Sequence, residues 1–244
     1  MTDAPVLIAG AGPTGLVLAL WLTKLGVRVR IIDKVAEPGT TSRALGVQAR
    51  TLELYQQMGI AQEVIDAGVQ TPAVNLWVNG ARAARIPFAN IGEGLSPYPY
   101  LLIYPQDEHE PLLIEKLRAI GVTVERPVEL VRFDEPASGG VRAVLKHQDG
   151  REETALASFL AGCDGAHSAV RETLGIGFPG GTYERLFYVA DVVATGPMTD
   201  SELHVALERS DLLAVFPMKG SGRVRFVGTV NVPEGSDREP RTFA

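Results

Sequence analysis

The hydrophobic pattern at the start of the chain predicts a strand, a helix and a second strand. Residues 6–9 form an uninterrupted apolar run that ends at a glycine, which is typical of a strand buried on both faces. Residues 16–25 are mostly apolar and are followed by Gly26, which predicts a helix ended by a glycine cap. Residues 27–32 predict the second strand, and Asp33 follows it directly.

Further helical and strand-like patterns fill the rest of the chain. Asn79-Gly80 separates two alternating stretches, residues 74–78 and 81–88, and this arrangement predicts a β-hairpin. Pro111 is compatible with a helix at residues 106–120 only near its first turn. The other predicted helices cover residues 44–58 and 61–67, and a short helix capped by Ser168 runs to residue 174. The other predicted strands cover residues 100–104, 122–125, 128–134, 141–147, 154–163, 187–195, 203–208, 212–217 and 224–232.

The order of these elements predicts an α/β fold that combines a Rossmann-like sheet with antiparallel β-structure. The opening unit and the strands near residue 160 suit a Rossmann-like mixed sheet, and the strands in the middle of the chain suit a β-meander. The strands after residue 180 predict a second, antiparallel sheet, to which the hairpin belongs. A sheet that faces a nucleotide domain is a place where a second ligand binds.

Composition and charge narrow the possible functions. The 244 residues are 45% hydrophobic and 21% charged, which is typical of a soluble globular protein. The net charge is −6 without long runs of one sign, so nucleic acid is not an expected partner. Cys163 is the only cysteine and the four histidines are scattered, which argues against a disulfide framework and a metal site. Glycines interrupt the apolar run of residues 5–23, and no targeting segment is evident. The sequence therefore predicts a cytoplasmic protein without membrane spans.

The glycine-rich turn at residues 10–15, GAGPTG, is the strongest candidate for a functional site. Gly10 permits a tight turn, Gly12 lets the backbone approach a pyrophosphate at the helix N-terminus, and Gly15 allows close helix–strand packing. Asp33 lies where a carboxylate accepts hydrogen bonds from a ribose and repels a 2′-phosphate, which favours FAD or NAD over NADP. A glycine turn that binds no nucleotide is the alternative.

Four motifs in this order resemble the FAD-dependent aromatic hydroxylases, a family of single-component flavoprotein monooxygenases. The family includes para-hydroxybenzoate hydroxylase and the polyketide-tailoring hydroxylases. The four motifs are GAGPTG (residues 10–15) with Asp33, SRA (residues 42–44) with RTLE (residues 50–53) and MG (residues 58–59), Gln106 with Leu112-Leu113, and CDGAHSAVR (residues 163–171). The fourth is similar to the family's second fingerprint, the DG motif.

The resemblance implies a set of FAD contacts. Pro13 and Thr14 belong to the glycine-rich fingerprint. Asp164 is expected to help hold FAD and the reducing nucleotide, the alternative being an aspartate that only begins a turn before a glycine. Arg43 is expected near the flavin and the pyrophosphate, or else is a solvated loop residue. Gln106 is expected on the ribityl chain, or else is a polar residue at a helix start. Lys34 either flanks the adenine ribose or is an ordinary surface residue.

The resemblance also implies a reaction. Reduced nicotinamide, NADH or NADPH, reduces FAD, and O2 supplies the oxygen atom that is added to an electron-rich aromatic ring. No acid or base residue is expected to be catalytic. Val215, Phe216, Phe226 and Val227 are either walls for the aromatic substrate or core residues. Two alternatives stay open: a reductase or epoxidase of the same superfamily, and a non-catalytic FAD-binding module.

One expected motif is not found. Members of the family carry a third motif of the type GDAAH, whose aspartate contacts the ribityl chain, and this sequence has none. We therefore expect an N-terminal fragment or a shortened variant. Residues 1–72 and 100–180 are predicted to form the FAD-binding domain, and residues 73–99 and 181–244 a partial substrate-binding sheet. An unfinished edge of that sheet favours association or a homo-oligomer.

Overall fold

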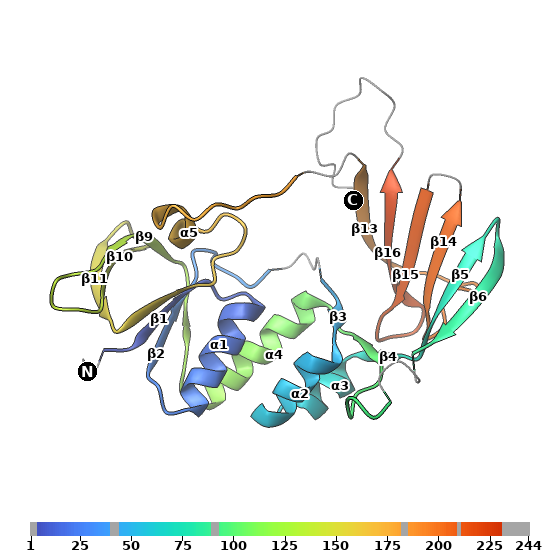
Figure 1. The fold of residues 1–244 in the computed structure, drawn as a ribbon, viewed down its shortest axis with the longest axis horizontal. Helices are drawn as coiled ribbons and strands as arrows, with labels where there is room; N and C mark the ends of the chain where they lie inside the picture. The colour runs from blue at the N-terminus through green and yellow to red at the C-terminus, as the bar shows by residue number, and fades with distance from the viewer. Residues whose placement is uncertain (1–3, 40–43, 89–92, 182–184, 209–210, 231–244) are drawn as a thin grey trace, which may run out of the picture. The chain divides into compact units, whose positions relative to one another are not determined.

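The computed structural model describes residues 4–39, 44–88, 93–181, 185–208 and 211–230 (Figure 1). It divides into two compact units, one formed by residues 1–42 and 106–179 and the other by residues 43–105 and 180–244. The mixed α/β class predicted from the sequence is confirmed. The functional roles predicted for the two parts, FAD binding and substrate binding, stay predictions.

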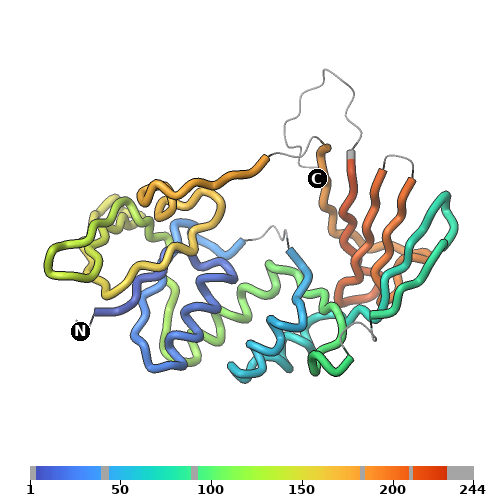
Figure 2. The backbone as a smooth tube through the Cα atoms, in the orientation of Figure 1, coloured from blue at the N-terminus to red at the C-terminus, as the bar shows by residue number. Residues whose placement is uncertain are grey.

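A parallel four-stranded sheet forms the centre of the first unit. Its strand order is β12 (Phe159–Gly162), β1 (Val6–Ala9), β2 (Val29–Ile32) and β8 (Val124–Glu125). Helices α1 (Pro13–Lys24) and α4 (Gln106–Ala119) pack against each other beside this sheet (Figures 1 and 2). The β-α-β unit predicted at the start of the chain is therefore present. Helix α1 begins three residues earlier than predicted because Pro13 is well suited to the first helical position.

The predicted strand at residues 154–163 is wrong in one respect, because it is two strands in two sheets. Strand β11 (Glu152–Ala157) ends before Ser158, and β12 begins after it. Ser158 donates its backbone N–H to the carbonyl of Pro5 at 3.0 Å, which transfers the chain to the parallel sheet beside β1. Among the described residues β12 is an edge strand, and Phe159 is 70% exposed, so this apolar run is not a buried strand.

The predicted meander is confirmed in strands β9 (Val128–Asp134), β10 (Val141–His147) and β11, which pair antiparallel in the order β11-β10-β9. The meander packs on the parallel sheet together with the short helix α5 (Ala169–Thr173). The apolar core between them contains Leu7, Ala9, Ile32, Val128, Leu130, Ala143, Leu145, Ala155, Ala157 and Val170.

Arg30 adds an ionic link between the parallel sheet and the meander. Its guanidinium contacts Glu125 of β8 at 2.7 Å and Glu153 of β11 at 2.6 Å. His147 contacts the same Glu153 carboxylate at 2.8 Å. Arg30 thus pairs with two carboxylates, and one of them also contacts an imidazole. The packing of the two sheets therefore depends on charge as well as on apolar burial.

A six-stranded sheet dominates the second unit. Its strand order is β13 (Leu186–Val193), β16 (Arg223–Val230), β15 (Asp211–Pro217), β14 (Leu203–Glu208), β5 (Ala73–Val78) and β6 (Ala81–Pro87). All neighbours pair antiparallel except β14 and β5, which are parallel. The hairpin predicted at Asn79-Gly80 is present, and both residues have positive φ angles, 51° and 72°.

The remaining elements of the second unit are helices α2 (Ala49–Met58) and α3 (Ala61–Ala67) and a small sheet. That sheet has the order β3 (Gly46–Val47), β7 (Leu101–Ile103) and β4 (Val69–Thr71). The helix predicted from residue 44 therefore starts late, because residues 46 and 47 pair with β7 instead. Tertiary pairing has replaced the local helical preference there.

Candidate cofactor site

The glycine-rich turn joins β1 to α1, and its three glycines have different surroundings. Gly10 has φ 102°, and a Cβ atom built on it would lie 2.2 Å from the carbonyl oxygen of Cys163. A Cβ atom on Gly15 would lie 1.9 Å from the carbonyl oxygen of Gly10. Packing within the chain therefore requires these two glycines. A Cβ atom on Gly12 meets no atom of the described residues within 4 Å, so packing does not explain this glycine.

The open space at Gly12 coincides with the N-terminus of α1. Gly12 is the N-cap, it makes no side-chain capping hydrogen bond, and the first turn contains no acidic residue. Pro13 occupies the first position of the helix and Thr14 is exposed. The first amides of a helix and its dipole attract anions, so the turn fits the pyrophosphate of a dinucleotide.

Asp33 is tied to the glycine-rich turn by hydrogen bonds. Its Oδ2 accepts the N–H of Ala11 at 2.7 Å, and its Oδ1 accepts the N–H of Val35 at 2.8 Å. A carboxylate has about four acceptor positions, so Asp33 can accept further donors besides these two. The predicted contact with a ribose hydroxyl stays a prediction. The neighbouring Lys34 is exposed, and its place beside the ribose is likewise a prediction.

Asp164 caps the short helix that follows it. Its Oδ1 accepts the hydroxyl of Ser168 at 2.5 Å, and its Oδ2 accepts the N–H of Ala169 at 2.7 Å. The Ser168 oxygen accepts the N–H of Arg171 at 3.0 Å, which confirms the predicted cap of α5. The DG turn lies beside the glycine-rich turn, because Cys163 donates its N–H to Ala9. The cofactor contact predicted for Asp164 stays a prediction.

Gln106 begins α4, as predicted, and its side chain is held by a residue that the sequence reading missed. Its Nε2 donates to Oε1 of Glu110 at 2.7 Å, and Oε2 of Glu110 accepts the N–H of Gly39 at 3.3 Å. Glu110 is only 5% exposed. The spacing of four residues between Gln106 and Glu110 on one helix was the available signal. Arg43 lies outside the described residues, so its predicted role stays a prediction.

Arg126 is the second residue that the sequence reading missed. It follows β8, beside Asp33, and its Nη1 lies 3.5 Å from Oδ1 of that carboxylate. Its guanidinium also donates to the carbonyls of Val35 at 2.9 Å and Ala11 at 3.2 Å. The available signal was its position at the carboxyl end of a predicted parallel strand.

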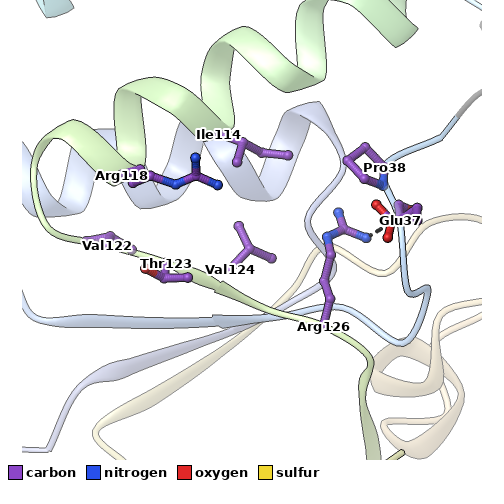
Figure 3. A pocket seen from close by; sticks show the side chains of 8 residues that line it. All are labelled: Glu37, Pro38, Ile114, Arg118, Val122, Thr123, Val124 and Arg126. Atoms are coloured by element: carbon purple, nitrogen blue, oxygen red, sulfur yellow. Dashed lines mark hydrogen bonds between the residues drawn. The ribbon is translucent and has the colours of Figure 1, made fainter.

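Arg126 also lines a cavity of about 240 Å³ between α4, β8 and the loop after β2 (Figure 3). The other lining residues are Glu37, Pro38, Ile114, Arg118, Val122, Thr123 and Val124. Figure 3 shows the guanidinium of Arg126 reaching from the strand towards Glu37 and Pro38. Its Nε is buried and has no partner among the described residues.

Two further observations concern the reactivity of Cys163 and the possibility of membrane-spanning helices. Burial raises the pKa of the Cys163 thiol, and the adjacent Asp164 carboxylate adds to this, so the thiol is not activated as a nucleophile. Within the described ranges, no helix combines the length and the apolar character needed to cross a bilayer.

Comparison with known proteins agrees with this geometry. The family model described as "FAD binding domain" matches residues 3–244. The chain belongs to this family. FAD, the cofactor expected from the motifs, is thereby confirmed as the cofactor of the domain, and the resemblance to flavoprotein monooxygenases is confirmed as well.

The curated relatives include several monooxygenases. The chain is 38% identical to 6-methylpretetramide 4-monooxygenase of Streptomyces rimosus over 97% of its own length and 42% of that protein. It is 32% identical to pentachlorophenol 4-monooxygenase of Sphingobium chlorophenolicum over 90% of its own length and 41% of that protein. The chain thus spans less than half the length of these relatives.

Solved structures show the same fold. The p-nitrophenol 4-monooxygenase of Pseudomonas putida DLL-E4 matches with a TM-score of 0.86 and 24% identity, over 96% of this chain and 59% of that one. A ternary complex of aklavinone-11 hydroxylase with FAD and aklavinone matches with a TM-score of 0.82 and 27% identity, over 97% of this chain and 48% of that one.

Proposed function

We propose that this chain is the FAD-binding part of a flavin-dependent monooxygenase that hydroxylates an aromatic or polyketide-like substrate. The proposal rests on Gly12, which lies at a helix N-terminus without a side-chain cap. Open space surrounds this residue, so packing does not explain why it is a glycine. The named activities of the relatives give the reaction class.

In this proposal the residues predicted from the sequence bind and orient the cofactor. Gly12, Pro13 and Thr14 hold the pyrophosphate, Asp33 accepts a ribose hydroxyl with Lys34 beside it, and Gln106 faces the ribityl chain. Asp164 fixes the DG turn next to the glycine-rich turn and contributes to cofactor and nicotinamide binding, and Arg43 adds a cation. Bound FAD supplies the redox chemistry, with NADH or NADPH as the reductant and O2 as the oxidant.

The predicted walls of a substrate pocket need revision. Val215 pairs with Phe226, whereas Phe216 pairs with Arg225 and Ala214 with Val227. Neighbouring residues of a strand point to opposite faces of a sheet. Val215 and Phe226 therefore share one face, and Phe216 and Val227 share the other, so the four side chains do not line a single pocket.

The first experiment is a visible absorption spectrum of the purified chain after incubation with FAD and removal of unbound flavin. A retained flavin spectrum is expected. NADH and NADPH oxidation is then measured with and without phenolic substrates, and the product mass is expected to rise by one oxygen atom. If the chain is part of a longer protein, the assay is repeated with that protein. Flavin binding without substrate-stimulated oxidation by either protein would favour a non-catalytic module. Oxidation without oxygen transfer would favour a reductase.

A further inference from the structure

The two backbone polar groups of Ala11, the residue before Gly12, are held by the two members of a single ion pair. Asp33 accepts the N–H of Ala11 at 2.7 Å, and Arg126 donates to the carbonyl of Ala11 at 3.2 Å. Asp33 and Arg126 in turn lie 3.5 Å apart. Ala11 is completely buried, so its two backbone polar groups depend on these two side chains.

The register of the parallel sheet brings this pair together. Ile32 of β2 lies opposite Glu125 of β8, so the next residues along each strand, Asp33 and Arg126, lie side by side. The backbone N–H of Asp33 donates to the carbonyl of Glu125 at 3.0 Å, and the N–H of Val128 donates to the carbonyl of Asp33 at 2.8 Å. Hydrogen bonds between the two segments thus continue past the ends of both strands, with Val128 donating in place of Pro127, which has no N–H, and they fix the backbone positions of Asp33 and Arg126.

The carbonyl of Ala11 and the N–H of Gly12 belong to the same planar trans peptide, in which the two bonds point in opposite directions. A hydrogen bond that fixes the carbonyl therefore also fixes the direction of the Gly12 N–H. Gly12 is the residue that opens onto free space at the N-terminus of α1. We propose that Arg126 is a positioning residue that aims the Gly12 N–H at the pyrophosphate of the bound dinucleotide, an inference that rests on the proposed FAD site.

The burial of Arg126 supports this role. Its side chain is only 11% exposed, and it also donates to the carbonyl of Val35 at 2.9 Å. The carbonyl of Glu37 accepts from the same guanidinium at 3.4 Å. Four neighbours from the glycine-rich turn and the loop after β2 thus surround one guanidinium, whose planar group of donors matches several acceptors at once. Lysine has a single ammonium group and does not reproduce this arrangement. The positive charge also offsets that of Asp33, which would otherwise repel a pyrophosphate.

The test measures binding of FAD and of ADP, the half of FAD that carries the pyrophosphate, by calorimetry with Arg126→Gln. Because Arg126 acts on the pyrophosphate contact, both dissociation constants are expected to rise by the same factor, about tenfold, as for the loss of one oriented hydrogen bond to a charged group. Arg142→Gln is the matched control. It removes an exposed arginine of the same unit, which pairs with Asp134 at 2.6 Å, and both affinities should stay within about twofold.

The outcomes distinguish a positioning role of Arg126 from a purely structural role. In a double-mutant cycle, Asp33→Asn and Arg126→Gln are expected to be non-additive for ADP affinity, because the two side chains contact each other and both hold the backbone of Ala11. An unchanged ADP affinity in a folded Arg126→Gln variant, or a loss confined to FAD, overturns the inference. If that variant does not fold, Arg126→Lys is measured instead, and a wild-type ADP affinity there overturns it equally. Absence of FAD and ADP binding to the wild-type chain would overturn the proposed function and this inference with it.

Discussion

The buried carboxylate of Glu110 and the side-chain amide of Gln106 form a hydrogen bond of 2.7 Å within one face of α4. A carboxylate only accepts, so the amide must present its NH2 group to Glu110, and its carbonyl oxygen is directed away from that carboxylate. Hydroxyl groups of a ribityl chain can donate to such an oxygen. In the proposed FAD site, Glu110 therefore sets the orientation of the Gln106 amide.

Replacement of Glu110 by glutamine is expected to weaken both folding and FAD binding. The new NH2 group conflicts with the amide of Gln106 or the N–H of Gly39, which costs about 1–3 kcal/mol of the free energy of unfolding. FAD affinity should fall, whereas ADP affinity should not, because ADP has no ribityl chain. Urea unfolding and calorimetry measure the two effects. The control is Glu115→Gln, an exposed position on the same helix. Equal losses for FAD and ADP would contradict the assignment.

Substitution of Gly15 is expected to reduce stability, whereas substitution of Gly12 is expected to reduce nucleotide binding. Gly15→Ala places a methyl group 1.9 Å from the carbonyl oxygen of Gly10, so the free energy of unfolding should drop by about 3 kcal/mol. Gly12→Ala meets no atom of the described residues within 4 Å and keeps an ordinary φ of −74°, so the melting temperature should barely change. Its methyl group instead occupies the space assigned to the pyrophosphate, and the Kd for ADP should rise at least about tenfold. Thermal melts and calorimetry test this, and unchanged ADP binding by Gly12→Ala would remove the main support for the site.

Much of the fold was predictable because the signals were local. The glycine-rich turn, the Asn79-Gly80 hairpin and the Ser168 cap each follow from a few adjacent residues whose preferences agree with the final structure. The errors occur where distant pairing decides. Ser158 joins two sheets because of a contact with Pro5, and residues 46 and 47 are strand rather than helix because they pair with β7.

The candidate site was predictable to the same extent. Gly12 and Asp33 follow from spacing along a β-α-β unit, but the ion pair of Asp33 with Arg126 depends on the pairing of β2 with β8, which are far apart in sequence. No local pattern marks an arginine as the partner of one carbonyl in a remote turn. The second role of Asp33, as acceptor for the N–H of Ala11, was also missed; it depends on the pairing of β1 with β2 within the β-α-β unit.

Acid is expected to destabilise the first unit in two separate pH ranges. Burial lowers the pKa of His109 from 6.5 to about 4, so the folded state disfavours the proton that the unfolded chain accepts. The contribution of His109 to the free energy of unfolding is fully present above pH 6.5. It is lost as the pH falls towards 4, by on the order of 3 kcal/mol. Denaturant unfolding as a function of pH should show this slope. It should vanish in His109→Gln and persist in His167→Gln, which changes an exposed histidine.

The second range lies lower and belongs to Glu153. Hydrogen bonds from Arg30, and then from His147, lower the pKa of this carboxyl from 4.5 to about 2. A depressed carboxyl pKa contributes stability above pH 4.5, and that contribution is lost as the pH falls towards 2. In Glu153→Gln, the free energy of unfolding should change less between pH 4.5 and 2, and its dependence on pH above 4.5 should stay the same. An unaltered slope below pH 4.5 would show that the link between β2 and the meander is weaker than its geometry indicates.

A chain of hydrogen bonds centred on the buried His204 should stabilise the second unit. Trp77 Nε1 donates to Nδ1 of His204 at 3.0 Å, and Nε2 of His204 lies 2.8 Å from Asp200. The indole N–H only donates, so Nδ1 is the acceptor and Nε2 carries the proton towards Asp200. His204 is 1% exposed, and His204→Phe leaves the indole N–H without its acceptor, which should cost about 2 kcal/mol in urea unfolding. Trp77→Phe combined with His204→Phe should cost less than the sum of the single changes, because the first removes the donor that the second leaves unpaired. Strict additivity would mean that the two rings contribute through packing alone.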